Sequence, residues 1–142
     1  MKRDMTTKSD WPTGPIVSLP RPFMDERGGI QPLFQGDFNT VQLITSKAGS
    51  IRANHYHKSD WHYCYIVSGR MRYHHRPAGS DQPPEWVLVT EGQAIFTPPL
   101  VEHAMEFLDD SVFLNVARNP RDQTQYEADL VRVELVKANT PN

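Results

Sequence analysis

Residues 49–69 read Gly49-Ser-Ile-Arg-Ala-Asn-His55-Tyr-His57-Lys-Ser-Asp-Trp-His62-Tyr-Cys-Tyr-Ile-Val-Ser-Gly69 and hold three of the six histidines of this 142-residue chain. Side chains at positions i and i+2 of a β-strand face the same way, so His55 and His57 should present two imidazoles to one side, about 7 Å apart along the backbone. His62 shares a face of the next predicted strand with Cys64, which lets its ring approach that pair across the sheet. The stretch therefore predicts a chelating site.

A fourth imidazole, that of His103, begins a predicted strand after the turn at Pro98 and Pro99. It can close the set from the opposite side. Four nitrogen donors suit Zn, Fe, Ni, Cu or Mn, whereas neutral imidazole holds Mg or Ca poorly. The alternative is that these histidines are ordinary surface or core residues, because the H-x-H spacing alone is a weak filter. His74 and His75 are treated as background.

The rest of the chain consists of short runs rich in Val, Ile, Thr and aromatic residues, separated by twelve prolines and eight glycines. This pattern predicts an all-β fold with about ten strands, little helix and a closed or sandwiched architecture. Only Asn119 to Asp129 could hold a turn or two of helix. Strands are expected at Ile16–Leu19, Ile30–Phe34, Val41–Thr45, Ile51–His57, Trp61–Ser68, Arg70–His75, Trp86–Thr90, Gln93–Thr97, His103–Leu108, Val112–Ala117 and Leu130–Val136.

Two segments together resemble the conserved motifs of the cupin superfamily. The first cupin motif, G-x5-H-x-H-x3,4-E-x6-G, is similar to residues 49–69, with His62 where the glutamate belongs. The second motif, G-x5-P-x-G-x2-H followed by an asparagine, is similar to residues 92–107. Gly92, Pro98 and His103 match it, whereas Leu100 replaces a glycine and Phe107 the asparagine. The resemblance implies a double-stranded β-helix, the RmlC-like jelly-roll barrel, with a flexible tail over 1–14 and a single cupin domain over 15–142.

The resemblance also implies a set of metal ligands. In cupins the two histidines and the glutamate of the first motif, with the histidine of the second, bind one metal inside the barrel. Carried over residue by residue, the ligands here are His55, His57, His62 and His103, holding one divalent transition metal. Replacing the carboxylate by His62 lowers the ligand charge, so Zn is the expected ion ahead of Ni, Cu, Fe or Mn. Cys64 is either a fifth donor or a small packed residue.

A narrower resemblance links Asp25–Ile30 and Arg52–Lys58 to cupins that act on nucleotide-linked keto-deoxysugars, namely 3-epimerases and 3,4-ketoisomerases. Some of those carry glutamine where His62 stands and work without metal, with a histidine as the base. This implies an isomerase whose substrate diphosphate is held by basic side chains such as Arg52, Lys58 or Arg72. The catalytic base is not identified. Asp25–Gly29 has the alternative reading of a polar turn between strands.

Two other function classes stay open at this point. One is a metal-dependent oxygenase, which leaves coordination positions free for substrate and oxygen, although four histidines depart from the two-histidine, one-carboxylate iron arrangement. The other is a non-catalytic module that binds a small molecule. An open metal position would favour an enzyme, whereas a closed set of four protein ligands would favour a structural site.

The charge and composition of the chain limit the kinds of binding partner to expect. The formal net charge of -2 gives no global attraction to nucleic acid or to an anionic membrane, and no apolar run reaches the roughly 20 residues of a membrane span. Cys64 is the single cysteine, so no intramolecular disulfide can form and a reducing cytoplasm is expected. Cupin barrels frequently pair through an N-terminal strand, so a homodimer through Ile16–Leu19 is expected by analogy.

Overall fold

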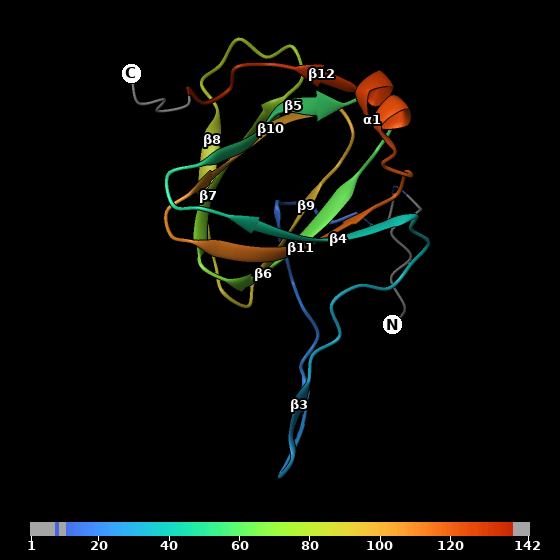
Figure 1. The fold of residues 1–142 in the computed structure, drawn as a ribbon, viewed down its shortest axis with the longest axis vertical. Coiled ribbons are helices and arrows are strands. Elements are labelled where there is room, and N and C mark those ends of the chain that lie inside the picture. The colour runs from blue at the N-terminus through green and yellow to red at the C-terminus, as the bar shows by residue number, and fades with distance from the viewer. Residues whose placement is uncertain (1–7, 9–10, 138–142) are drawn as a thin grey trace.

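The computed structural model describes residue 8 and residues 11–137, and within them the regular secondary structure is almost all β-strand. Its one helix in this part, α1, lies at the rim of the barrel (Figure 1). The elements are β1 (Ile16–Val17), β2 (Phe23–Asp25), β3 (Gly28–Ile30), β4 (Thr40–Ser46), β5 (Ile51–His57), β6 (His62–Ser68), β7 (Arg70–Pro77), β8 (Glu85–Thr90), β9 (Ala94–Thr97), β10 (Val101–Phe107), β11 (Ser111–Ala117), α1 (Gln123–Asp129) and β12 (Leu130–Arg132).

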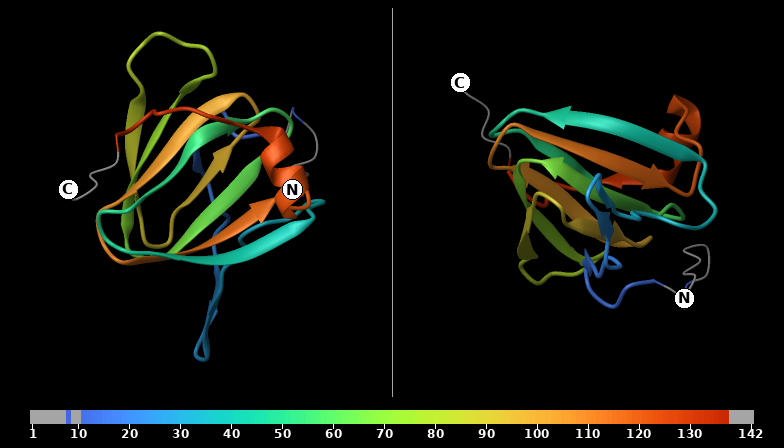
Figure 2. Two further views of the ribbon diagram at one scale, coloured as in Figure 1. Left: turned by 45° about the horizontal axis from the view of Figure 1, so that its top comes forward. Right: turned by 90° about the horizontal axis from the view of Figure 1, so that it is seen from below.

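Two five-stranded antiparallel sheets make the barrel. Their strand orders are β1-β9-β6-β11-β4 and β12-β5-β10-β7-β8. The sheets lie face to face (Figure 2) and enclose a core that includes Ile66, Met71, Phe107 and Phe113, each almost fully buried. Most neighbouring strands in these sheets are far apart in the sequence, as in a jelly roll. The expected all-β jelly-roll fold is confirmed.

The turn that ends the first motif shows why this position requires glycine. Gly69 links β6 to β7 with a φ of 95°, in the left-handed region that disfavours a side chain. A Cβ at this position would meet the side chain of Ser111 and lie 2.8 Å from the carbonyl oxygen of Asp110. By contrast, Leu100 adopts a φ of 63° at the position where the second motif has glycine, so the backbone turn survives the substitution.

The outer face of the first sheet carries a second apolar cluster. Trp61, Tyr63 and Phe96 pack there under the N-terminal segment, where Trp11 lies 5.7 Å from the ring of Phe96. The inward face of β6 is thereby left to His62, Cys64 and Ile66, as the alternation predicts. Residues 1–7 and 9–10 of the expected flexible tail lie outside the described residues.

Three strand predictions fail at their ends. No strand covers Ile30–Phe34: Pro32 cannot donate to a sheet, and Phe34 instead packs its ring 5.4 Å from that of Tyr63. The first strand stops at Val17. The last strand stops at Arg132, after which the chain leaves the sheet and is held by Asn54.

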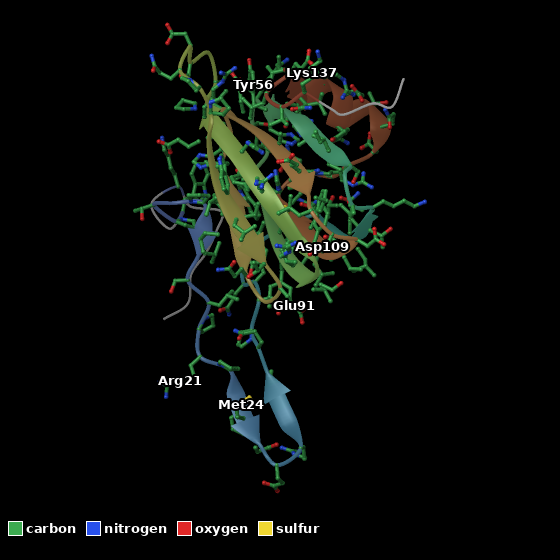
Figure 3. The ribbon with its side chains drawn as sticks, turned by 90° about the vertical axis from the view of Figure 1, so that its left-hand side faces the viewer. Arg21, Met24, Tyr56, Glu91, Asp109 and Lys137 are labelled. Carbon is green, nitrogen blue, oxygen red and sulfur yellow. The ribbon has the colours of Figure 1, made fainter. Side chains whose placement is uncertain are left out.

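Residues 23–30 form a hairpin that projects from the barrel (Figures 1 and 3). The Asp25 side chain accepts hydrogen bonds from the backbone N–H and the guanidinium of Arg27, which fixes the turn. Three apolar side chains on it, those of Phe23, Met24 and Ile30, are 59–66% exposed. Within one chain, Asp25–Gly29 thus forms a polar turn between two strands.

None of the helices in the described part of the chain is long and apolar enough to cross a membrane.

Candidate active site

A cavity of about 340 Å³ opens inside the barrel, between the two sheets and beneath α1. Its walls are mixed: imidazole and amide groups, two arginines, and a few apolar side chains. The lining residues are Gln42, Ile44, Arg52, Ala53, His55, His62, His103, Met105, Phe113, Asn115, Arg121, Gln123 and Tyr126. The volume and the polar groups suit a small polar ligand.

The four predicted histidines converge at this cavity. His55 and His57 come from β5, His62 from the start of β6 and His103 from β10, and each is at most 5% exposed. Ring nitrogens of His55, His57 and His103 all lie within 4.8 Å of one another. His62 joins the group through a 3.0 Å contact between its Nε2 and Nε2 of His103. Three of the rings line the cavity, and His57 lies behind them.

Hydrogen bonds set the tautomers of two of these rings. His103 Nδ1 lies 2.9 Å from the carbonyl oxygen of Val101, which can only accept, so the proton is on Nδ1. His57 Nδ1 lies 3.1 Å from Oδ2 of Asp129, with the same consequence when that carboxyl is ionised. Both Nε2 atoms therefore carry lone pairs. His57 Nε2 and His55 Nδ1 are buried, and neither has a hydrogen-bond partner among the described residues.

The contact between His62 and His103 requires a proton or a cation between two nitrogens. Because His103 Nε2 has a lone pair, a cation-free His62 must donate from its Nε2. Its Nδ1 then lies 3.3 Å from the sulfur of Cys64, whose single thiol hydrogen is donated either to this nitrogen or to Asn115. The same sulfur lies 3.3 Å from Oδ1 of Asn115. Cys64 therefore supports the far side of the His62 ring and is not among the converging donors.

Burial keeps all four imidazoles neutral near pH 7. It lowers the pKa of His55 to about 2 and that of His103 to about 3, and it lowers the pKa of His62 and of His57 as well. The other rings and the charge of Arg121 act in the same direction on His55. The cavity wall therefore carries unprotonated nitrogens.

A backbone irregularity aims the histidines of β5. Ala53 and Asn54 have φ values of 71° and 53°, and the pairing of β5 with β10 shifts register beside them. Such bulges re-aim side chains in a strand. The Asn54 side chain donates to the carbonyl oxygen of Val136 and accepts from its N–H, at 2.9 and 3.0 Å, which holds the strained segment next to His55.

Asp60 and Asp129 form a hydrogen-bond network beside His57. Asp129 accepts from the N–H and hydroxyl of Ser59 and from the N–H of Asp60, in addition to His57. Asp60 accepts from the backbone N–H of Asn119 and from Arg121. Every carboxylate oxygen of the pair therefore already accepts at least one hydrogen bond, so this group orients its neighbours.

Of the basic residues expected to hold a diphosphate, only Arg52 lines the cavity. Arg72 lies outside it, with its guanidinium 5.2 Å from the ring centroid of Trp86, and the Lys58 ammonium donates to the carbonyl oxygen of Ala128. The structure therefore does not place these two side chains on the cavity wall, and the strand alternation puts Arg72 on the outer face of its sheet. Sequence reasoning missed Arg121 and Tyr126, since no motif marks the segment that carries them.

No protein-family model and no curated protein sequence matches the chain. Solved structures do. The 3,4-ketoisomerase QdtA of Thermoanaerobacterium thermosaccharolyticum, in complex with TDP, superposes with a TM-score of 0.67 at 19% identity, over 82% of this chain and 85% of that one. The 3'-monoepimerase ChmJ of Streptomyces bikiniensis, in complex with dTDP-quinovose, gives 0.67 at 19%, over 82% and 67%. A 3,4-ketoisomerase of Helicobacter canadensis gives 0.69 at 14%, over 82% and 88%.

Sheet order, barrel and these likenesses together show that the chain has the cupin fold. More particularly, it has the RmlC-like form of that fold.

Proposed function

We propose that this protein is an isomerase or epimerase of a nucleotide-linked keto-deoxysugar. The observation that carries the proposal is the convergence of neutral imidazoles on a cavity that also contains two arginines. An unprotonated imidazole accepts a proton, and arginine binds phosphate and carbonyl oxygens. Solved structures similar to this one include two 3,4-ketoisomerases and a 3'-monoepimerase, two of them solved with a TDP-containing ligand, which supports the same substrate class.

The chemistry begins with removal of the proton on the carbon next to the ketone. That proton moves to an imidazole nitrogen, the C–H electron pair becomes the C=C bond of an enolate, and the carbonyl π pair moves to oxygen. Return of a proton to the opposite face of the same carbon gives an epimer. Return to the former carbonyl carbon, with loss of the neighbouring hydroxyl proton, gives a ketoisomer.

We assign the base to His55, because its ring lines the cavity, whereas the other two rings that line it, those of His62 and His103, are joined to each other by a 3.0 Å contact. Burial and neighbouring positive charge lower the pKa of the free imidazole to about 2. A bound substrate that carries a diphosphate brings negative charge, which raises that pKa toward a useful value.

The product decides whether the proposal holds. Incubation with TDP-4-keto-6-deoxyglucose, followed by proton NMR, should yield a sugar epimer or ketoisomer still attached to TDP. Unchanged substrate, together with tight binding of TDP, would contradict catalysis and leave a binding module.

Metal binding is a second candidate, favoured by the buried unpartnered atoms His55 Nδ1 and His57 Nε2. His55, His57 and His103 offer converging lone pairs, with His62 beside them, and their neutral state fits the donor chemistry of Zn ahead of Ni, Cu, Fe or Mn. A bound ion would supply a Lewis acid for the ketone oxygen. Because one lone pair cannot both bind an ion and accept a proton, this site excludes His55 as the base.

Metal analysis of the untagged protein separates the two uses of the cluster. If the cluster is a metal site, mass spectrometry should find near-stoichiometric metal, lost in both His57→Ala and His103→Ala and retained in His74→Gln, whose ring lies outside the cavity beside Glu106. A wild type that holds no metal, and takes none up from ZnCl₂, would contradict the metal site.

We also propose that the protein is a homodimer through the projecting hairpin. This hairpin extends away from its own barrel (Figure 1), and Phe23, Met24 and Ile30, which lie on it, are mostly exposed. The edge strand β4 displays Val41 and Leu43, 55% and 67% exposed, which offers a second copy a surface of matching character. The N-terminal strand expected to make this contact, β1, pairs with β9 of its own chain.

Light scattering on a gel-filtration column tests the dimer. Wild type should elute with twice the mass of one chain, and the double variant Phe23→Asp with Met24→Asp should elute as one chain. Leu88→Asp, an exposed apolar residue on β8 of the other sheet, is the matched control and should stay dimeric. A wild-type monomer would contradict the proposal, as would a dimer that survives the double change.

A cytoplasmic location belongs to the same proposal. The single cysteine, Cys64, is a buried free thiol, and burial raises its pKa to about 12. A thiol of this kind supports a protein built for a reducing compartment.

A further inference from the structure

Arg121 brings a permanent positive charge into the barrel. It lies between β11 and α1, and its side chain is only 12% exposed. The same cavity is lined by His55, His62 and His103, so the guanidinium and the imidazoles face one space. Arginine stays protonated at any pH at which the protein is folded. The cavity therefore contains both proton acceptors and a fixed cation.

The guanidinium is held on two sides. One terminal nitrogen donates to Oδ2 of Asp60 over 3.2 Å, and Asp60 is itself 2% exposed and fixed by the N–H of Asn119. The guanidinium carbon lies 5.3 Å from the ring centroid of Tyr126 on α1. These contacts fix the fork in one orientation before any ligand arrives, which is what electrostatic catalysis requires.

One donor of this fork is unused. Nε of Arg121 is buried and has no hydrogen-bond partner among the described residues. Buried N–H groups are nearly always hydrogen-bonded, so this one shows that the protein leaves part of the donor capacity of Arg121, whose side chain lines the cavity, for an acceptor from outside. Of the possible acceptors, an anionic oxygen compensates the charge best.

We propose that Arg121 is the oxyanion-binding residue of this cavity, and that its guanidinium donates to the ketone oxygen of the substrate as that oxygen becomes an enolate. The inference rests on the proposed function. In the proton-abstraction step, the proton goes from carbon to His55 and the electron pair ends on oxygen, so the negative charge forms while the guanidinium charge is beside it. The electrostatic effect of Arg121 on the neighbouring rings, which lowers the pKa of His55 and His103, is consistent with that placement.

The competing source of an anionic oxygen is the substrate diphosphate. If Arg121 binds the enolate, Arg121→Gln should slow exchange of the substrate hydrogen for solvent deuterium by about 10²- to 10³-fold. Its affinity for TDP, which has no ketone, should stay within threefold of wild type. Arg118→Gln removes the same charge from an exposed site three residues away and should change neither value. A parallel loss of TDP affinity and exchange in Arg121→Gln would overturn the proposal in favour of diphosphate binding.

The variant Arg121→Lys separates the loss of the hydrogen bond from a folding defect. It keeps the charge and can still pair with Asp60, but lacks the planar fork of N–H donors, so it should fold and lose at least tenfold in exchange. Full exchange by this variant would contradict the assigned hydrogen bond.

A probe without a sugar keeps the inference separate from the substrate class. Oxalate is planar and carries anionic oxygens, as an enolate does, and in chelator-treated buffer it should bind wild type at least tenfold more tightly than Arg121→Gln and shift the guanidinium N–H resonances of Arg121. If wild type converts no nucleotide sugar but oxalate binds in this way, the proposed substrate class is wrong and the oxyanion site is supported. Equal oxalate binding by wild type and Arg121→Gln would overturn the site.

Discussion

Replacing His55 by glutamine should reduce conversion of TDP-4-keto-6-deoxyglucose by about 10²- to 10⁴-fold, the usual contribution of a positioned general base. Glutamine keeps much of the volume and polarity of the ring but cannot accept a proton near pH 7. His55 is the assigned base because it lines the cavity and lies beside His57 and His103, with ring centroids 4.8 and 4.9 Å away. The rate of product formation by NMR measures the loss.

Two comparisons make this result specific. His74→Gln changes a histidine on the outer side of the second sheet, where it pairs with Glu106, and should leave the rate unchanged. TDP should bind His55→Gln as it binds wild type, because removing the base leaves the arginines in place. Undiminished conversion by His55→Gln would contradict the assignment and move the base to another ring of the cluster.

Acidification should unfold the protein between pH 6.5 and about pH 4. The folded-state pKa of all four buried histidines lies below the unfolded value of 6.5, so the unfolded chain binds more protons as the pH falls. Their contribution to stability is complete above pH 6.5 and decreases as the pH drops below it. Each ring costs roughly 1.4 kcal/mol per pH unit well below 6.5. Four rings together approach the whole stability of a small domain, about 5–15 kcal/mol.

Urea unfolding at pH 7, 6 and 5 measures this slope. His103→Gln removes one of the four groups and should flatten the slope by about a quarter. His74→Gln, outside the cluster, should keep the wild-type slope. A free energy of unfolding that stays constant from pH 7 to pH 5 would show that the rings are not held neutral by burial.

The fold could be predicted because its signals are local. Alternating strands, turn glycines such as Gly69 and the two spaced motifs each survive in a single sequence. The errors came where tertiary contacts outweigh the local pattern. Ile30–Phe34 has a strand-like composition, yet Phe34 gains more by packing on the aromatic cluster at Trp61 than from pairing. Val133 and Val136 leave the sheet because Asn54 holds them.

The histidines of the site could also be predicted, because their spacing on strands is fixed by the β period. The residues that orient these histidines, or share the cavity with them, could not be predicted. Asp129, which orients His57, is 72 residues away along the chain, and Arg121 reaches the cavity from a loop that resembles any polar connection. Asn54 is part of the first motif, yet nothing in its neighbours marks the two left-handed residues that aim His55. The ligand roles of the histidines stay a prediction.

The charge of Arg121 also bears on the choice between the two uses of the cluster. A guanidinium on the wall of the same cavity repels a divalent cation and attracts an enolate. Both effects favour proton abstraction with arginine as the electrostatic partner over metal binding.

The most direct test of this account is proton exchange in D₂O with TDP-4-keto-6-deoxyglucose and chelator-treated wild-type protein. The account predicts that the hydrogen on the carbon next to the ketone disappears from the proton spectrum at a rate that added ZnCl₂ does not increase. Retention of that hydrogen, while TDP-4-keto-6-deoxyglucose binds in the cavity, would contradict it.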